Sequence, residues 1–258
     1  MTDLHWKTAI TKVEANKISI RGYRLDELIG KVSYGQMVYL VFKGDMPSNE
    51  VGKIIEAILV SSIDHGATPP SALSAITVAS TGAELNASVA AGILAISKFH
   101  GGAIEECMVL LKNGMGKIIS QGSSIKQAVQ QVISEYRNEK QRLSGFGHRL
   151  HTNDPRTKKL FALAEECNIS GRYIQLIREF EAELEHSLGR KLPINVDGTI
   201  AALLCELDFD PILANAFFMI ARVPGLVAHI YEEKTRYKPM RKIHPSDIEY
   251  DGPEDKEG

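Results

Sequence analysis

The stretch from Ser71 to Ser97 contains a single charged side chain, Glu84, and consists mainly of Ala, Ser, Thr, Gly and aliphatic residues. A helix that is apolar or small on every side is normally buried, and small side chains let neighbouring helices approach closely. We therefore expect this block to form either a central core helix or a helix-rich interface between subunits. In both cases the rest of the fold must supply the surfaces that cover it.

Helical periodicity, with apolar residues three or four positions apart, recurs along most of the chain. Strand-like alternation occurs only around Lys17–Arg21, where residues 9–23 predict a short hairpin or an extended arm. The segments with helical spacing are Leu25–Leu40, the helix opened by Pro47-Ser48, Glu105–Leu111, Ile125–Tyr136, Pro155–Cys167, Tyr173–Leu188, Thr199–Leu207 and Pro211–Glu233, the last broken near Pro224-Gly225. The pattern predicts an all-α protein with almost no sheet.

Composition is typical of a soluble globular protein, with 258 residues, 44% hydrophobic and 24% charged. A net charge of -2 argues against broad affinity for nucleic acid or membranes, so we expect neither as a partner. The N-terminus lacks the basic start and apolar run of a signal peptide, and charges interrupt the longest apolar stretches before the length of a membrane span. We expect a cytoplasmic protein.

Three widely spaced cysteines, Cys107, Cys167 and Cys205, form neither a disulfide framework nor a zinc-binding spacing. All three occur in apolar helical contexts. We expect buried thiols, as in a reducing compartment.

Residues 144–156 concentrate glycine, histidine and arginine. Gly145 and Gly147 flank Phe146 and lead directly into His148-Arg149, so the backbone can bend tightly and pass close to a ligand. Asp154-Pro155 is typical of an N-cap and first helical residue, which places Arg156 in the first turn of a helix. Such a helix start suits an anionic ligand. The alternative is a glycine turn with a solvated basic flank.

Three other places put polar groups beside glycine at predicted helix ends. They are Asp64-His65-Gly66, His100-Gly101-Gly102 and Asn195-Val196-Asp197-Gly198. Taken singly, a histidine there is more often a cap or a hydrogen-bonded core residue, and an aspartate before glycine is usually a turn.

Taken together, the motifs resemble those of a known family. Phe99–Ala103, Gly145–Arg149 with Asp154–Arg156, and Pro193–Asp197 resemble the three active-site signatures of the citrate synthase family, in the family's order. The resemblance extends from about residue 20 to 250. The chain is shorter than a typical citrate synthase and in this respect is similar to the citryl-CoA lyase module of ATP-citrate lyase and to short stand-alone citryl-CoA lyases.

The resemblance implies an all-α, two-domain homodimer. The larger domain would comprise residues 1–103 and 209–258 and the smaller one residues 104–208, with residues 71–97 in the dimer core. The active sites would lie between the domains. A higher oligomer, or a place in a larger lyase complex, is also consistent with the family.

The resemblance also assigns roles to individual residues. Asp197 would be the base for the acetyl carbon, or its proton donor in cleavage. His100 would donate to the enolate oxygen of the thioester, and His148 to the keto oxygen. This matches the chemistry, because an enolate mechanism needs a carboxylate to move the carbon proton and donors at both oxygens.

Binding residues follow in the same way. Arg156, Arg222 and His65 would bind the polycarboxylate substrate, since guanidinium groups recognise carboxylates bidentately. Arg222 stands alone in an apolar run, so its alternative is a structural ion pair. Coenzyme A, as the thioester of substrate or product, would contact Gly145, Phe146, Gly147, Arg149 and Lys191. No metal or redox cofactor is implied.

Two departures from the family leave the function open. Ile243 stands where the family commonly has an arginine, so either Arg241 or Lys242 replaces it or the substrate lacks one carboxylate. The lyase module usually has no histidine at the position of His100, whereas citrate synthases do.

We expect cleavage of citryl-CoA to acetyl-CoA and oxaloacetate. A lyase for a methylcitryl- or citramalyl-type thioester and a short citrate synthase are the alternatives, and a non-catalytic subunit that binds CoA or an organic acid is the rival of another class. A zinc hydrolase is less favoured, because no two histidines are spaced as a helical ligand pair.

Overall fold

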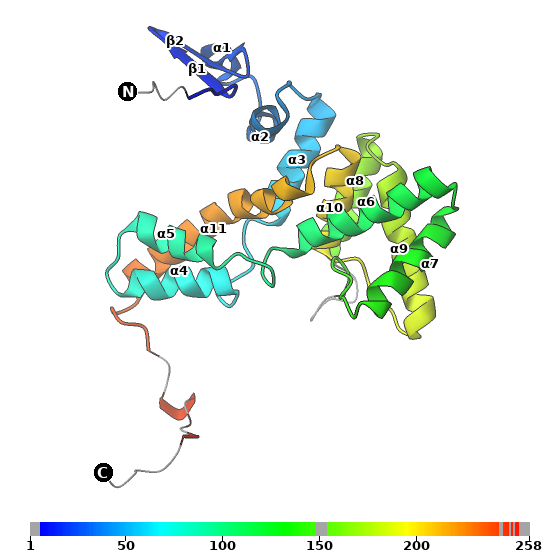
Figure 1. Cartoon of the computed structure of the whole chain (residues 1–258). Coiled ribbons are helices and arrows are strands. Elements are labelled where there is room, and N and C mark those ends of the chain that lie inside the picture. The colour runs from blue at the N-terminus through cyan, green and yellow to red at the C-terminus, as the bar shows by residue number, and fades with distance from the viewer. Residues whose placement is uncertain (1–5, 148–153, 243–244, 248, 250, 253–258) are drawn as a thin grey trace, which may run out of the picture. The chain divides into compact units, whose positions relative to one another are not determined.

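A computed structural model describes residues 6–147, 154–242, 245–247, 249 and 251–252 of the chain. The chain forms two compact units, Met1–Asp64 with Ile96–Arg222 and His65–Ala95 with Val223–Gly258. We call these the first and the second unit. The elements are mostly helices, which confirms the predicted helical class (Figure 1). The predicted division at residues 103 and 209 and the homodimer stay predictions.

The first unit begins with a small antiparallel sheet. Strands β1 (Thr11–Glu14), β2 (Lys17–Ile20) and β3 (Tyr23–Arg24) pair in the order β1-β2-β3, with Val13 opposite Ile18. The predicted hairpin is therefore confirmed.

Helices make up the remainder of the first unit. They are α1 (Leu25–Leu28), α2 (Tyr34–Lys43), α3 (Asn49–Ser61), α6 (Ala103–Gln121), α7 (Ile125–Asn138), α8 (Pro155–Glu166), α9 (Arg172–Leu188), α10 (Val196–Glu206) and the 3-10 turn η1 (Pro211–Leu213), followed by the start of α11 (Ala214–Arg236).

Helix α10 forms the centre of this unit. Its residues from Gly198 to Cys205 are all buried, and it packs against α6, α8 and α9 (Figure 1). Ala201 and Ala202, both fully buried, allow these neighbours to approach closely. Because α10 is enclosed on all sides, its position is fixed by the whole core of the unit.

The last residue of α10 fixes the start of α9. One carboxylate oxygen of Glu206 accepts hydrogen bonds from the backbone N–H groups of Gly171, Tyr173 and Ile174, at 3.0, 2.8 and 3.0 Å. The first N–H groups of a helix have no partner within the helix, and they favour a negative charge. Glu206 therefore caps α9 from a different helix and ties α9 to α10.

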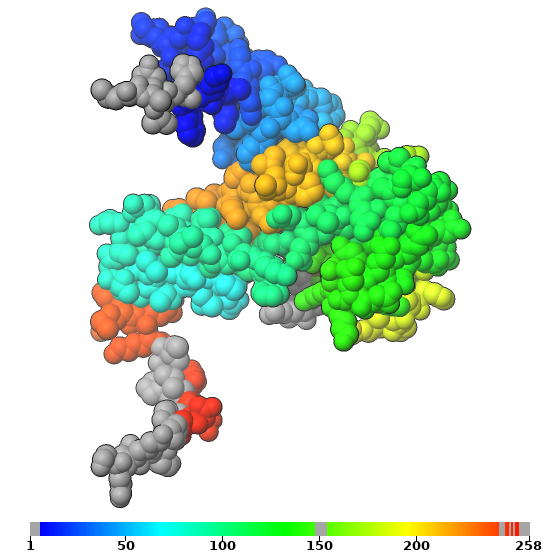
Figure 2. All heavy atoms as spheres, viewed as in Figure 1, coloured from blue at the N-terminus to red at the C-terminus, as the bar shows by residue number. Residues whose placement is uncertain are grey.

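The second unit contains the alanine-rich block, which forms two helices, α4 (Pro70–Ser80) and α5 (Leu85–Leu94). They pack with the second half of α11 around a small core of Ala75, Ala79, Leu226 and Ile230. Helix α5 buries only Ser88 and Gly92. Leu85 is 48% exposed and Leu94 is 82% exposed, so these two side chains are not covered within one chain. Figure 2 shows the block that contains α4 and α5, in cyan and teal, as part of the molecular surface.

Helix α11 runs through Pro224 without interruption, so the predicted break near Pro224-Gly225 is wrong. The missing N–H of Pro224 removes one intrahelical hydrogen bond but does not end the helix, which continues to Arg236. By length and composition alone, Pro211–Arg236 could cross a membrane, with a mean hydropathy of 1.6. Core helices of soluble proteins pass the same test, so this is weak evidence for a span, and the expected absence of a membrane partner stays a prediction.

The segment after α11 is anchored within the second unit. Arg241 forms an ion pair with the buried Glu233 and stacks over Tyr237. The backbone N–H groups of Met240 and Arg241 donate to the backbone carbonyl and the hydroxyl of Ser80, at 2.7 and 3.2 Å. Arg241 thus has a structural partner in its own chain. Lys242 is exposed, and Ile243 lies outside the described residues.

Replacing Glu206 by Ala should lower the free energy of unfolding by about 2 kcal/mol, because three backbone donors of α9 lose a charged acceptor. Glu206→Gln, which keeps one oxygen, should cost about half as much. Urea denaturation measures both, with Glu185→Ala on the exposed face of α9 as the matched control. Equal losses in Glu206→Ala and Glu185→Ala would contradict the capping role.

Candidate active site

The loop Gly145-Phe146-Gly147 lies directly against the start of α10. A Cβ atom at Gly198 would sit 2.3 Å from the carbonyl oxygen of Gly145, and one at Gly145 would sit 2.6 Å from Sγ of Cys107. Gly145 also has a φ of 94°, a left-handed conformation that favours glycine. The predicted tight bend is confirmed, and both glycines are required for two backbones to touch.

Hydrogen bonds hold this loop to the segment before α10. The N–H of Asn195 donates to the carbonyl of Gly145 at 3.0 Å, and the N–H of Gly147 donates to the carbonyl of Pro193 at 2.7 Å. Phe146 pairs with Ile194 in an isolated antiparallel bridge, and its side chain is buried. Phe146 therefore packs in the core, so only its backbone is suited to contact a ligand.

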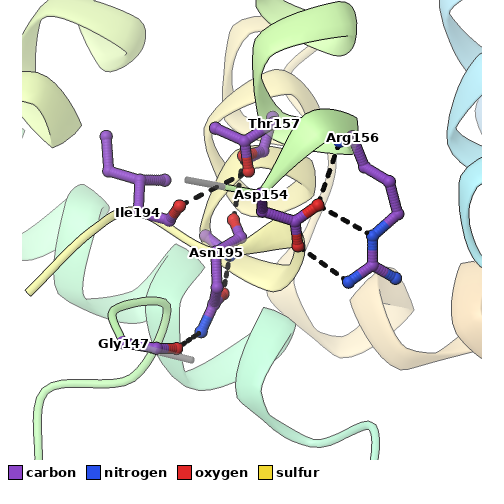
Figure 3. A network of polar contacts seen from close by, with 8 residues as sticks. Gly147, Asp154, Arg156, Thr157, Ile194 and Asn195 are labelled. Carbon is purple, nitrogen blue, oxygen red and sulfur yellow. Dashed lines mark hydrogen bonds and ion pairs between the residues drawn. The ribbon is translucent and has the colours of Figure 1, made fainter. Parts of the chain in front are cut away.

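Asn195 joins the loop to the helix. Its Oδ1 accepts from the N–H of Gly198 at 3.0 Å and caps α10, while its Nδ2 donates to the carbonyl of Gly147 at 2.9 Å (Figure 3). One side chain thus fixes the start of the helix that carries Asp197 and the residue that precedes His148.

The start of α8 lies beside the same junction. Asp154 caps α8, as the sequence predicts, by accepting from the backbone N–H of Arg156 at 2.9 Å. Its carboxylate also binds the guanidinium of Arg156 through Nε at 3.0 Å and Nη2 at 2.7 Å (Figure 3). The hydroxyl of Thr199 in α10 lies 2.9 Å from that of Thr157, the next residue of α8.

Asp197 occupies the first turn of α10 and is partly exposed. Burial raises the pKa of its carboxyl, Arg156 and Arg222 lower that pKa, and Asp154 raises it. The net shift is upward. A partly buried carboxyl with a raised pKa, under the influence of two guanidinium groups, is suited to exchange a proton with a bound substrate.

Arg222 is only 3% exposed and is held from two sides. Its Nε donates to the carbonyl of Ser62 at 3.1 Å, and its guanidinium carbon lies 4.6 Å from the centre of the Phe218 ring. Burial lowers the pKa of Arg222, and the charge of Asp64 partly restores it. A buried guanidinium that shares one site with Arg156 and Asp197 can bind a carboxylate.

His100 lies at the end of a tight loop that precedes α6. Its N–H and carbonyl both bond to Ser97 at 2.9 Å, and its ring stands edge-on to Phe218 with the ring centres 5.6 Å apart. A Cβ atom at Gly101, which has a φ of 87°, would lie 2.8 Å from both Ile96 and Phe218. The ring of Phe218 therefore contacts two predicted site residues, His100 and Arg222.

The other predicted residues fall in different places. Lys191 is exposed on the loop before α10, and His65 is exposed before α4 in the second unit. His148 and Arg149 lie outside the described residues. The three thiols are buried as expected, and burial raises the pKa of Cys107 well above its usual range.

Three residues contribute more to the geometry of the site than the sequence analysis indicated. Asp154 was recognised only as a cap, Asn195 only as part of a motif, and Phe218 not at all. Only the spacing of Phe218, one helical turn before Arg222, could have indicated its role. Within the described residues no group of three His, Cys, Asp or Glu side chains could hold a metal ion.

Comparison with known proteins places this site in a family. The family model of the citrate synthase C-terminal domain matches residues 47–246. The chain belongs to the citrate synthase family.

Within that family, the chain is similar to a citryl-CoA lyase from Hydrogenobacter thermophilus, with 42% identity, a TM-score of 0.88, and coverage of 98% of this chain and 96% of that one. An ATP citrate lyase from Methanothrix soehngenii has the same fold, with 22% identity and a TM-score of 0.83 over 98% of this chain and 43% of that one. Among curated proteins, the ATP-citrate synthase beta chain protein 1 of Arabidopsis thaliana is 25% identical over 92% of this chain. The chain spans 39% of the length of that relative.

The raised pKa of Asp197 predicts a stability penalty for its ionised form. Below the ordinary pKa of 3.8 the carboxyl is protonated in both states, so no penalty exists. As pH rises through the window between 3.8 and the raised native pKa, the unfolded state ionises first and stability falls.

Asp197→Asn should therefore be more stable than the wild type at pH 7 and indistinguishable from it at pH 3. Urea denaturation across this range measures the difference. Asp45→Asn, which removes an exposed carboxyl outside the site, is the control. A variant less stable than the wild type at pH 7 would contradict the assignment.

Proposed function

We propose that this protein cleaves citryl-CoA to acetyl-CoA and oxaloacetate. The observation that carries the proposal is the 42% identity, along 98% of this chain and 96% of the other, to a citryl-CoA lyase. A neighbour of the same fold was solved with citrate and coenzyme A, which supports the same ligand class.

In the proposed reaction, His148 accepts the proton of the tertiary hydroxyl as the carbon–carbon bond breaks. The hydroxyl carbon becomes the keto carbon of oxaloacetate, and the bonding electrons pass to the thioester fragment as an enolate. His100 donates a hydrogen bond to the enolate oxygen, and Asp197 delivers a proton to the carbon, giving acetyl-CoA. Burial raises the pKa of Asp197, which supports a role as acid, because an upward shift increases the share of the protonated form at a given pH.

The carboxylates of the substrate would bind to Arg156 and Arg222, with His65 as a further donor. Arg222 supports this role through its burial and its two fixed contacts, which hold its guanidinium without loss of rotamer freedom on binding. Coenzyme A would run along the backbone of Gly145-Phe146-Gly147, with Arg149 and Lys191 near its phosphates.

Two features keep alternatives open. The histidine at position 100 favours a short citrate synthase, and Ile243 favours a related acyl-CoA such as a methylcitryl or citramalyl thioester. Arg241 is paired with Glu233, which leaves Lys242 as the better cationic substitute near Ile243. A non-catalytic CoA-binding subunit is the rival of another class, and the intact set of His100, His148 and Asp197 argues against it.

Purified protein should release acetyl-CoA and oxaloacetate from synthetic citryl-CoA, without releasing CoA from acetyl-CoA plus oxaloacetate. Asp197→Asn should reduce the cleavage rate by about three orders of magnitude, because the proton donor to carbon is lost. Coupling oxaloacetate to malate dehydrogenase measures cleavage, a thiol reagent measures condensation, and Asp45→Asn is the control. CoA release from the condensation pair would identify a citrate synthase instead.

We also propose a cytoplasmic homodimer in which α5 packs against α5 of a second copy, whether alone or in a larger lyase complex. The exposure of Leu85 and Leu94 on a nearly uncharged helix supports this, since an apolar helix face normally finds a partner. The domain division at residues 103 and 209 is part of the same family-based proposal.

Leu94→Glu should weaken this dimer by about 100-fold, because a charge would be buried without a partner. Light scattering after size-exclusion chromatography measures the mass over a dilution series. Val60→Glu, at another exposed apolar position in the first unit, is the matched control. A wild-type monomer at all concentrations would refute the dimer.

A further inference from the structure

Asp154 makes more contacts than a helix cap requires. A cap needs one oxygen, yet Oδ1 of Asp154 accepts from both the backbone N–H and Nε of Arg156, and Oδ2 accepts from Nη2 (Figure 3). The Asp154 side chain is 1% exposed and that of Arg156 is 25% exposed. A carboxylate is therefore buried behind an accessible guanidinium that would bind substrate.

The geometry of this pair fixes the guanidinium. A two-point contact to a carboxylate sets the plane of the group as well as its position. Because Nε and Nη2 face Asp154, the edge that carries Nη1 is turned away from it. Across the described part of the chain, the hydrogen bonds of Arg156 come from its backbone N–H, Nε and Nη2, so Nη1 can donate to a ligand.

The pair also sets the charge around Asp197. Within the described residues, the charged groups that act on Asp197 are Arg156 and Asp154 from the start of α8 and Arg222 from α11, and Asp197 in turn acts on the thiol of Cys107 in α6. The two arginines favour the ionised carboxylate, and Asp154 opposes them. Without Asp154, the field of Arg156 at Asp197 would be uncompensated.

We propose that Asp154 is a positioning residue for the cleavage reaction, holding Arg156 in one orientation for a substrate carboxylate and offsetting the charge of Arg156 at Asp197. This rests on the proposed function. Asp154 acts through Arg156 and through the field at Asp197, and it does not itself contact substrate.

The test replaces Asp154 by Asn, which caps a helix equally well. Asn differs from Asp in having an amide nitrogen in place of one carboxylate oxygen and in carrying no charge. Its amide nitrogen cannot accept from Nη2, so the guanidinium loses one of its two anchors. We expect KM for citryl-CoA and the dissociation constant of citrate, measured by calorimetry, to rise about tenfold or more. The alkaline limb of the kcat profile should move to lower pH, because removing the negative charge lowers the pKa of Asp197, which must be protonated to act.

A second arm separates positioning from a purely structural role. If Asp154 acts on binding through Arg156, then Asp154→Asn should add little to the loss of citrate affinity already caused by Arg156→Gln. Asp210→Asn removes the charge of another aspartate cap, at η1, and is the matched control for a generic capping cost. Asp154→Ser, a further capping residue without the second oxygen, replaces the Asn variant if that variant does not fold.

The outcomes distinguish this proposal from the function on which it rests. Unchanged citrate affinity and an unchanged pH profile in Asp154→Asn would overturn the positioning role, as would losses that add fully to those of Arg156→Gln. Weakened citrate binding in a protein whose wild type leaves citryl-CoA intact would support the orientation of Arg156 and refute the lyase.

Discussion

The contact between the backbones of Gly145 and Gly198 is the constraint on which the site depends. No side chain fits between them, since a Cβ at Gly198 would overlap the carbonyl oxygen of Gly145 at 2.3 Å. This approach brings the loop before His148 to the first turn of the helix that carries Asp197. The side chain of Asn195 then donates to the carbonyl of Gly147 and accepts from the N–H of Gly198, and its backbone N–H donates to the carbonyl of Gly145, so these backbone groups are satisfied. The close approach of the two glycines and the cap by Asn195 thus together fix the loop against the start of α10.

The junction between this loop and α10 is held in place by the rest of the first unit. Helix α10 is buried from Gly198 to Cys205, its first turn is fixed by Asn195, and its last residue caps α9. A site on such a helix is less able to relax than one on a loop. The rigidity carries a cost, because the same enclosure raises the pKa of Asp197 and penalises its ionised form. A raised pKa is useful for proton transfer and unfavourable for folding, so catalysis and stability are opposed at this residue.

Local patterns predicted those features that depend on a few neighbouring residues. The hairpin at residues 9–23, the cap at Asp154 and the bend at Gly145 follow from turn and capping chemistry within a few positions. The capping of α9 by Glu206 and the contact of Phe218 with His100 depend on partners more than thirty residues away, which a single sequence does not display. Periodicity shows which face of a helix is apolar but not what covers that face. The sequence therefore did not reveal that α10 is the buried helix and that α5 buries only two of its residues. The predicted break at Pro224 is wrong because the prediction assumed that the loss of one backbone hydrogen bond ends a helix. In the structure, the buried side chains of Phe217, Ala221 and Leu226 stabilise α11 on both sides of Pro224.

The four described residues of the site that lie in the first unit have a further consequence for experiments. Asp197, Arg156, Arg222 and His100 all belong to the first unit, and their mutual geometry is set by hydrogen bonds and ring contacts inside that unit. Helix α5, with its exposed leucines, belongs to the second unit and makes none of those bonds. A substitution on the exposed face of α5 therefore leaves the bonds of Asn195 and Asp154 intact. A loss of activity in such a variant, with unchanged stability, would report on assembly, because the chemistry within the first unit has not been altered.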